Sequence, residues 1–298
     1  MTSTFNDIQN TFKKGNIFTK LIMVNVSAFV IYWILTIFFP TVRNALTIPG
    51  SFSEVLYQPW TIVTYMFLHE GFLHLLFNML WLFWFGRIFL QFLHDKQLLA
   101  VYLIGGFAGA LVHLAVNEML APEHRAGIVG ASAAVMAVVF AAALYKPDFK
   151  IHLLFIGPVK IKYVAYVALA LDIMGALQNL KEGAVGGDGV AHIAHMGGAL
   201  YGIWFAVQMR KGKDITRKFN NFLDDFFTWV QNLFNSDKKQ KPTKTYNRFQ
   251  KPQSDWEFNK NKAERQKEVD RILDKISKSG YDSLSKKEKE FLFKFKDE

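Results

Sequence analysis

The chain has 298 residues, of which 51% are hydrophobic and 15% are aromatic, and its mean hydropathy is positive. It contains no cysteine, which excludes disulfides, thiolate nucleophiles and cysteine metal sites. The formal net charge is +10, but the basic residues flank apolar segments or gather near the C-terminus. This distribution is typical of a membrane protein with a basic tail and argues against a nucleic-acid partner.

Six apolar segments approach the roughly 20 residues that a helix needs to cross a hydrocarbon core about 30 Å thick. In chain order they are Leu21–Phe39, Leu73–Phe92, Leu98–Leu120, Ser132–Tyr145, Ile161–Leu177 and Ala191–Val207. The fourth is short and rich in alanine, which suits an interior helix shielded from lipid. The first is too long for a signal peptide, and no small-x-small cleavage site follows it. The sequence therefore predicts an all-α fold, a polytopic six-helix membrane bundle.

The distribution of basic residues in short loops predicts the orientation of the bundle. If the N-terminus is cytoplasmic, the inside segments carry Lys13, Lys14, Lys20, Arg87, Lys96, Lys146, Lys150, Lys160, Lys162, Arg210 and Lys211. The outside loops carry only Arg43, Arg125 and Lys181. We therefore expect a multi-pass protein of the cell (inner) membrane with both termini in the cytoplasm. The turns before the second, fourth and sixth spans then face the exterior.

Composition divides the chain into a cytoplasmic N-terminal tail, a membrane domain, an amphipathic helix, a polar linker and a small helical hairpin. The expected bounds are 1–15, 16–209, 210–235, 236–258 and 259–298. Aromatic and aliphatic residues at helical spacing in the third segment indicate a helix on the cytoplasmic leaflet, although packing on a soluble element is an equal alternative. In the last segment, Ser285 and Glu288 form a capping-box pattern.

Ser132 is the only serine between Ser53 and Ser236, and it lies in the run Gly127-Ile-Val-Gly-Ala-Ser-Ala. The two glycines allow a sharp turn and a close backbone approach. Ser132 then opens a helix whose free N–H groups favour an anion. The hydroxyl is a candidate nucleophile, and a simple helix-capping role is the alternative.

A serine hydroxyl needs a base to act as a nucleophile. The sixth segment begins Val190-Ala-His-Ile-Ala-His, and ionisable residues at membrane depth mark functional sites by default. His195 is followed by Gly198 and Gly202, which form a G-x-x-x-G face suited to close helix contact. This face should bring His195 against the alanine-rich fourth segment. We interpret His192, one turn earlier, as structural or interfacial.

The second segment begins His69-Glu-Gly-Phe-Leu-His74, with Asn78 four residues later on the same helix face. His74 and Asn78 can donate hydrogen bonds to developing negative charge, as an oxyanion hole requires. The alternative is a polar pair that joins helices. A zinc site is disfavoured, because His69 and His74 point about 140° apart at 100° per residue and zinc ligands must converge.

These runs together resemble the rhomboid family of intramembrane serine proteases, in its bacterial six-span form with a cytoplasmic extension. The H-x-x-x-x-H-x-x-x-N, G-x-S and A-H-x-x-G-x-x-x-G patterns fall on the second, fourth and sixth spans in the family's order. The resemblance implies a serine endopeptidase that cleaves the transmembrane helix of a membrane-protein substrate near the outer leaflet. It needs no cofactor or metal, and its other partner is the lipid bilayer.

The resemblance also implies roles for individual residues. Ser132 would be the nucleophile and His195 the general base of a Ser–His dyad, with no acidic third member. His74, Asn78 and the Ser132 amide would form the oxyanion hole. Substrate contact would fall to Gly130 and Ala131, whereas the structural residues would be His69, Gly198 and Gly202.

Three positions depart from the family pattern: Thr61 after Trp60, Ala133 after the serine, and Met136 in place of an aromatic residue. The first leaves open how the loop after the first span is anchored. Asp172 lies within the fifth span and should face the bundle interior or be protonated, because charge at this depth is costly. Two other functions remain open: an inactive rhomboid-like protein that binds transmembrane helices, and a transporter with a proton path through His192, His195 and Asp172.

Overall fold

The computed structural model describes residues 15–120, 127–153, 157–181 and 191–234, together with residues 269–272, 274–278, 284–285 and 288. The chain divides into two units, Met1–Phe234 and Asn235–Glu298, and each is described by itself. Residues 1–14 of the expected N-terminal tail and the whole expected linker at 236–258 lie outside the described residues.

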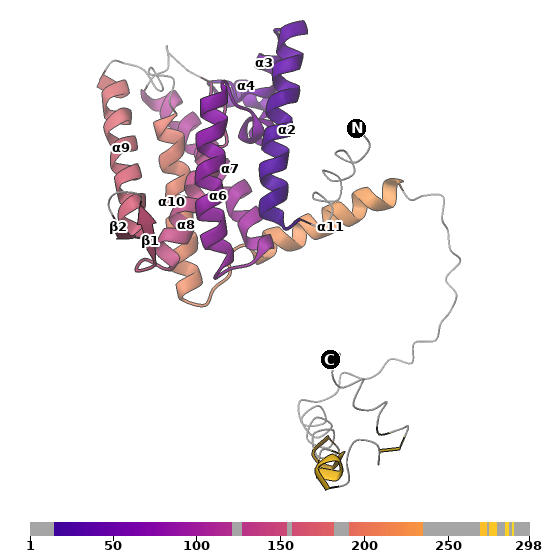
Figure 1. The fold of residues 1–298 in the computed structure, drawn as a ribbon. Coiled ribbons are helices and arrows are strands. Elements are labelled where there is room, and N and C mark those ends of the chain that lie inside the picture. Colours follow the sequence, from indigo (N-terminus) through magenta and orange to yellow (C-terminus); the bar gives the residue numbers. More distant parts are fainter. Residues whose placement is uncertain are drawn as a thin grey trace. The chain divides into compact units, whose positions relative to one another are not determined.

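Six long helices of the first unit stand side by side in Figure 1. They are α2 (Ile17–Phe38), α6 (Phe72–Leu90), α7 (Asp95–Leu120), α8 (Ser132–Tyr145), α9 (Ile161–Lys181) and α10 (His192–Arg210). Four of them, α2, α6, α7 and α9, are long and apolar enough to cross a membrane, and α8 is a shorter apolar helix. The mostly helical multi-pass membrane fold predicted from the sequence is therefore confirmed.

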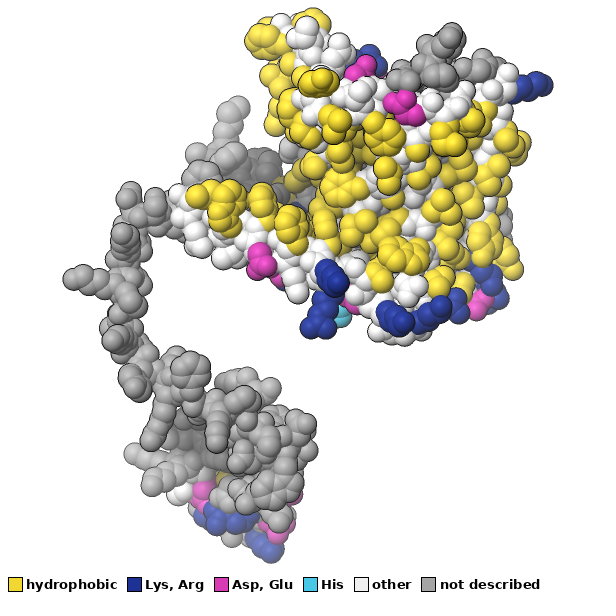
Figure 2. Space-filling view, turned by 180° about the vertical axis from the view of Figure 1, so that it is seen from behind, with side chains coloured by type: hydrophobic (Ala, Val, Ile, Leu, Met, Phe, Trp, Pro, Cys, Tyr) yellow, Lys and Arg dark blue, Asp and Glu magenta, His cyan; other side chains and the backbone are white. Residues whose placement is uncertain are grey.

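The short helix α8 lies at the centre of the bundle. Every residue from Ala133 to Ala143 is buried, and the helix packs chiefly against α10, α7 and α6. By contrast, most side chains of α2 and α9 face outward. Figure 2 shows the resulting cover of hydrophobic side chains on one face of the bundle, with Lys and Arg gathered mainly at the end nearer α11. Apolar sides between charged ends are what a bilayer requires.

Glycines on α10 allow its backbone to touch that of α8. A Cβ atom added to Gly198 would lie 2.0 Å from the carbonyl oxygen of Ala133, and one added to Gly202 would lie 2.3 Å from that of Ala137. No side chain fits at such distances. The two glycines are four residues apart and therefore share the face that contacts α8.

Helix α7 joins the same contact from a third direction and carries buried polar bonds. Added Cβ atoms at Gly105 and Gly109 would lie 2.1 and 2.5 Å from the Cβ atoms of the two alanines that the α10 glycines meet. Among the buried polar groups, the Tyr102 hydroxyl donates to the Met66 carbonyl at 2.8 Å, and the Asn25 amide donates to the Tyr102 oxygen at 3.2 Å. These bonds satisfy polar groups that would be costly to leave unpaired away from water.

The segment between α2 and α6 folds into four short helices, which the sequence did not indicate. They are α3 (Val42–Leu46), α4 (Phe52–Tyr57), α5 (Thr61–Thr64) and the 3₁₀ helix η1 (Tyr65–Phe67). The Trp60 indole donates to the Ala45 carbonyl at 2.7 Å, and the buried Thr61 hydroxyl donates to the Gln58 carbonyl at 2.6 Å. At Trp60 and Thr61, where the sequence departs from the family pattern, the segment is thus held by hydrogen bonds to its own backbone.

A β-hairpin between α8 and α9 was also not predicted. Strands β1 (Lys150–Leu153) and β2 (Gly157–Lys160) pair antiparallel, with Ile151 opposite Val159. Beside the hairpin, Asp148 accepts hydrogen bonds from the ammonium groups of Lys160 and Lys162 at 2.9 and 3.1 Å. These bonds hold the pKa of Asp148 below its usual value, so the carboxylate stays charged at this end of the bundle.

After α10 the chain turns into the amphipathic helix α11 (Arg217–Phe234). Asp214 accepts from the Thr216 amide at 2.9 Å and from the Gln97 side chain at 2.7 Å, and Lys96 pairs with Asp224 at 2.6 Å. These contacts tie the first half of α11 to the start of α7. Its exposed apolar residues are Phe222, Phe226, Phe227, Trp229 and Leu233.

The described residues of the second unit are helical at 269–272, at 274–278 and at 288. Val269, Ile272 and Leu284 are buried there. The Ser285 amide donates to Glu288 Oε2 at 2.7 Å, and the Glu288 amide donates to Ser285 Oγ at 3.4 Å. This reciprocal pair is the capping box that the sequence indicates.

The glycine contact between α10 and α8 gives the first prediction. Gly198→Ala should lower the thermal unfolding midpoint of the purified protein in detergent, because the new methyl group forces the two backbones apart. Overpacking of this kind costs about 1–3 kcal/mol, and more where backbone must move. Gly71→Ala is the matched control, since an added Cβ there meets nothing within 4 Å. Equal midpoints for the two variants would contradict the close packing of α10 on α8.

Candidate active site

The turn before Ser132 is held by the segment between α2 and α6. Ile48 and Ile128 form an isolated antiparallel bridge with backbone hydrogen bonds of 3.1 and 3.0 Å. One residue earlier, an added Cβ at Gly127 would lie 2.4 Å from the Ile48 carbonyl oxygen. The Gly130 amide then donates to the Tyr65 carbonyl at 3.0 Å. The approach to Ser132 is therefore built by residues far earlier in the chain.

Gly130 has φ +137°, in the region that favours glycine. A Cβ added there would lie 2.9 Å from the His74 imidazole and 3.5 Å from Ser132 Oγ. The absence of a side chain thus leaves one small space that both polar groups border. Helix α8 begins at Ser132, and the preceding residue, Ala131, has no side chain that could cap the helix. Ser132 therefore occupies the first helical position.

His74 and Asn78 lie on the same face of α6, and Asn78 is nearly buried. The Asn78 amide donates one hydrogen bond to the His74 carbonyl at 2.9 Å, which leaves its second N–H for another acceptor. His69 is fully buried, and its ring meets the His74 ring edge-on with centroids 5.1 Å apart. The His69 ring thus packs against the His74 ring.

His195 lies one turn into α10, where its ring is engaged from α9. Its Nδ1 atom is 2.8 Å from Asp172 Oδ1, and the Nδ1 atom of His192 is 2.8 Å from the same oxygen. Asp172 is 8% exposed, so its carboxylate does face the bundle interior. The sequence analysis gave Asp172 no part in the protease and grouped it with His192 and His195 only in the transporter alternative.

Helix packing brings His195 next to the start of α8. Gly109 of α7 would meet both Ala133 and the carbonyl of Ala194 if it carried a side chain, at 2.5 and 2.7 Å. The residues adjoining Ser132 and His195 therefore contact the same glycine. Within the described chain, the Ser132 hydroxyl and the His195 ring form no hydrogen bond with each other. Catalytic hydrogen bonds in unliganded sites are often long and shorten only when substrate binds.

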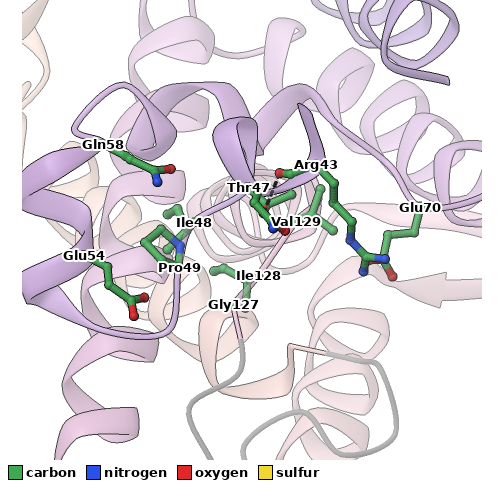
Figure 3. A pocket seen from close by; sticks show the side chains of 11 residues that line it. Arg43, Thr47, Ile48, Pro49, Glu54, Gln58, Glu70, Gly127, Ile128 and Val129 are labelled. Atoms are coloured by element: carbon green, nitrogen blue, oxygen red, sulfur yellow. Dashed lines mark hydrogen bonds and ion pairs between the residues drawn. The ribbon is translucent and has the colours of Figure 1, made fainter. Parts of the chain in front are cut away.

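The same histidines are the residues best placed to hold a metal ion. Among the described residues, Asp172, His192 and His195 offer ligand atoms that lie within 4.8 Å of one another. The zinc-like run is arranged differently: His69 and Glu70 precede α6, and the Glu70 carboxylate pairs with Arg43. Figure 3 shows that pair at the edge of a pocket lined also by Ile48, Gly127 and their neighbours.

That pocket has a volume of about 380 Å³ and adjoins the backbone that leads to Ser132. Its walls come from the α3 region and from residues 127–129, and Thr47, Glu54 and Gln58 contribute polar groups (Figure 3). The pocket therefore lies beside the Ile48–Ile128 bridge that joins the segment after α2 to the turn before α8. None of the expected site residues lines this pocket, although Gly127, Ile128 and Val129, which directly precede Gly130, do.

The fold and site define a multi-pass membrane protein with a serine at an interior helix start and a carboxylate-bound histidine beside it. Comparison with known proteins identifies the family. A model of the Rhomboid domain matches residues 56–212, which is more than half of the chain. The chain belongs to the rhomboid family. Residues 254–295, in the second unit, match a family of unknown function (DUF6576).

Similar proteins include the mitochondrial presenilin-associated rhomboid-like protein of Bos taurus, with 29% identity over 191 residues, 63% of this chain and 47% of that protein. Rhomboid-related protein 1 of Caenorhabditis elegans is 30% identical over 163 residues, 53% of this chain and 43% of that protein. The mitochondrial RHOMBOID-like protein 12 of Arabidopsis thaliana is 26% identical over 165 residues, 51% of this chain and 47% of that protein.

The chain thus spans about half the length of these curated relatives. They come from animals and a plant, and two of the three are named as mitochondrial. They lend no support to the bacterial type of the family that the sequence suggested. What they share with the chain is the rhomboid domain.

Proposed function

We propose that this protein is an intramembrane serine endopeptidase that cleaves a transmembrane segment of a membrane-protein substrate near the outer leaflet. The observation that carries the proposal is the backbone contact of α10 with α8, because it sets His195 beside the start of the helix that Ser132 opens. Membership of the rhomboid family supports the same reaction.

In the proposed reaction, Ser132 Oγ attacks the scissile carbonyl carbon while His195 Nε2 takes the hydroxyl proton. The carbonyl electron pair moves to its oxygen, which the His74 ring, the free Asn78 N–H and the Ser132 amide stabilise. The C–N bond then breaks, and the imidazolium gives its proton to the leaving amine. A water molecule, deprotonated by His195, hydrolyses the acyl-enzyme and restores Ser132.

Gly130 and Ala131 are the proposed substrate contacts. Gly130 exposes backbone beside Ser132 because it has no side chain, and Ala131 adds only a methyl group. Both termini are proposed to lie in the cytoplasm of a cell whose inner membrane holds the protein. The concentration of basic residues at the end of the bundle where α10 finishes supports that orientation (Figure 2).

The test uses the full chain purified in detergent or reconstituted in liposomes, with a transmembrane peptide as substrate. Wild type should cleave it and react with a fluorophosphonate probe, whereas Ser132→Ala should do neither and His195→Ala should show no measurable turnover. His152→Ala, on the exposed face of β1, is the matched histidine control and should behave as wild type. A wild-type protein that neither cleaves the peptide nor reacts with the fluorophosphonate probe would contradict the proposal. Loss of cleavage in His192→Ala but not in His195→Ala would reassign the base.

The oxyanion assignment has its own test. His74→Ala and Asn78→Ala should each reduce kcat by about 10²–10³, the usual effect of losing one such donor. The thermal midpoint must be measured alongside, since Asn78 also bonds to the α6 backbone. Unchanged kcat in both variants would show that neither residue holds the oxyanion.

A second candidate function, a proton-coupled transporter, is favoured by one observation. Asp172, His192 and His195 form a continuous hydrogen-bonded group inside the bundle, and such groups carry protons in membrane transporters. The two functions separate cleanly in liposomes. Transport predicts proton or solute flux that survives Ser132→Ala, whereas proteolysis requires that hydroxyl.

For the C-terminal region we propose that α11 lies on the cytoplasmic leaflet, with its aromatic face in the lipid. Its tie to α7 through Lys96 and Asp224 places it at the basic end of the bundle, and its apolar residues there are exposed. The second unit, in this proposal, is a small cytoplasmic helical hairpin that regulates or localises the enzyme.

Truncation tests these roles. A chain that ends at Phe234 should keep the wild-type cleavage rate within about twofold, because it retains every residue of the first unit. A chain that ends at Arg210 also loses the bond between Asp214 and Gln97 and should have a lower thermal midpoint. Loss of turnover in the Phe234 truncation alone would mean that the second unit takes part in catalysis.

A further inference from the structure

Asp172 is a buried carboxylate in the middle of α9 that the proposed dyad does not use. It is 8% exposed, and the two imidazole nitrogens that lie 2.8 Å from its Oδ1 atom come from the first turn of the next helix. An ionised carboxylate at membrane depth is costly unless strong hydrogen bonds compensate. A proton on each of those two nitrogens would form a bond of that kind with the carboxylate.

The contact determines which nitrogen of His195 carries the proton. An ionised carboxylate can only accept hydrogen bonds, so when Asp172 is ionised the protonated nitrogen of His195 is Nδ1. The Nε2 atom then carries a lone pair and is free to accept a proton. The reaction proposed above needs that tautomer, because Ser132 must give its proton to Nε2.

His192 contacts the same carboxylate oxygen as His195. Its ring is seated against Gly175, where an added Cβ would lie 2.2 Å from His192 Nε2. Gly175 is one turn beyond Asp172 on α9, so the same helix face provides both the carboxylate and the space for the His192 ring. The carboxylate is therefore fixed between two rings whose centroids are 6.1 Å apart.

We propose that Asp172 is a positioning residue that selects the His195 tautomer and balances the charge of its imidazolium, with His192 holding Asp172 in place. The inference rests on the proposed protease function. When Ser132 Oγ bonds to the scissile carbon, its proton passes to His195 Nε2, and the new positive charge lies one hydrogen bond from the Asp172 carboxylate. The proton then leaves with the amine, and Asp172 itself is never protonated.

A purely structural role, in which Asp172 only joins α9 to α10, makes different predictions. Asp172→Asn keeps the shape and one acceptor, so a structural link should survive better than in Asp172→Ala. For tautomer selection, Asn is no better than Ala, because its amide N–H can turn to His195 Nδ1 and place the ring proton on Nε2. Comparison of the kcat values of the two variants therefore distinguishes tautomer selection from a purely structural role.

The experiment measures kcat, KM and the thermal midpoint of the full chain in liposomes for wild type and both Asp172 variants. Each variant should lose about 10²- to 10⁴-fold in kcat with little change in KM, as when the aspartate of a serine-protease triad is replaced. The matched control is Asn179→Ala, a buried polar residue two turns along the same helix, which should keep kcat near wild type. Wild-type kcat in Asp172→Asn, or losses that follow the thermal midpoint in all three variants, would overturn the proposal.

A second measurement does not depend on turnover or on the folding of a variant at Asp172. In ¹⁵N-histidine-labelled protein, the His195 signals, assigned by their loss in His195→Ala, should show a protonated Nδ1 and an unprotonated Nε2 at neutral pH. The opposite tautomer in wild type would overturn the proposal. If wild type cleaves nothing, the protease proposal fails; if it cleaves and only the Asp172 results disagree, the positioning role alone fails.

Discussion

The arrangement of the whole bundle depends on the direct contact between the backbones of α10 and α8. Gly198 and Gly202 lie against the carbonyl groups of Ala133 and Ala137 at distances that exclude any side chain. In a bilayer, helices gain little from hiding apolar surface, so close van der Waals contact of this kind is a main source of association. The same contact sets the beginning of α10 beside the beginning of α8, where the two candidate catalytic groups lie.

Around this contact, the polar groups of the site are held by different parts of the chain. The turn before Ser132 is fixed by Ile48 and Tyr65, which belong to the segment between the first two long helices. His195 is held by Asp172 of the neighbouring helix α9. Each group thus has a support outside its own helix. A site built in this way can stay ordered although it lies among small side chains that offer little packing of their own.

Much of this arrangement could be predicted from the sequence. Apolar length gave the six helices, with α8 beginning and ending at the residues expected, and the spacing of Gly198 and Gly202 indicated the close face of α10. Those features follow from local composition and from helical period. The residue-level roles of Ser132, His195, His74 and Asn78 stay predictions.

The rest depended on three-dimensional neighbours that a single sequence does not reveal. The helices α3 to η1 and the strands β1 and β2 are only a few residues long. Such short elements show too few residues for a periodic pattern of apolar side chains to be recognised. The alternation of Lys150, Ile151, His152 and Leu153 was the available signal for the hairpin. Asp172 was recognised as out of place in an apolar span, but no spacing rule connects it to His195, because the two residues lie on different helices.

The shortness of α8 has a consequence for where chemistry can occur. Fourteen helical residues extend about 21 Å, some 9 Å less than a hydrocarbon core of about 30 Å. If Tyr145 reaches one boundary, Ser132 lies well beneath the opposite one, under the level of the lipid headgroups. The proposed hydrolysis at that depth requires a water-filled cavity that reaches Ser132. It also requires the substrate helix to unwind before its scissile bond reaches the serine.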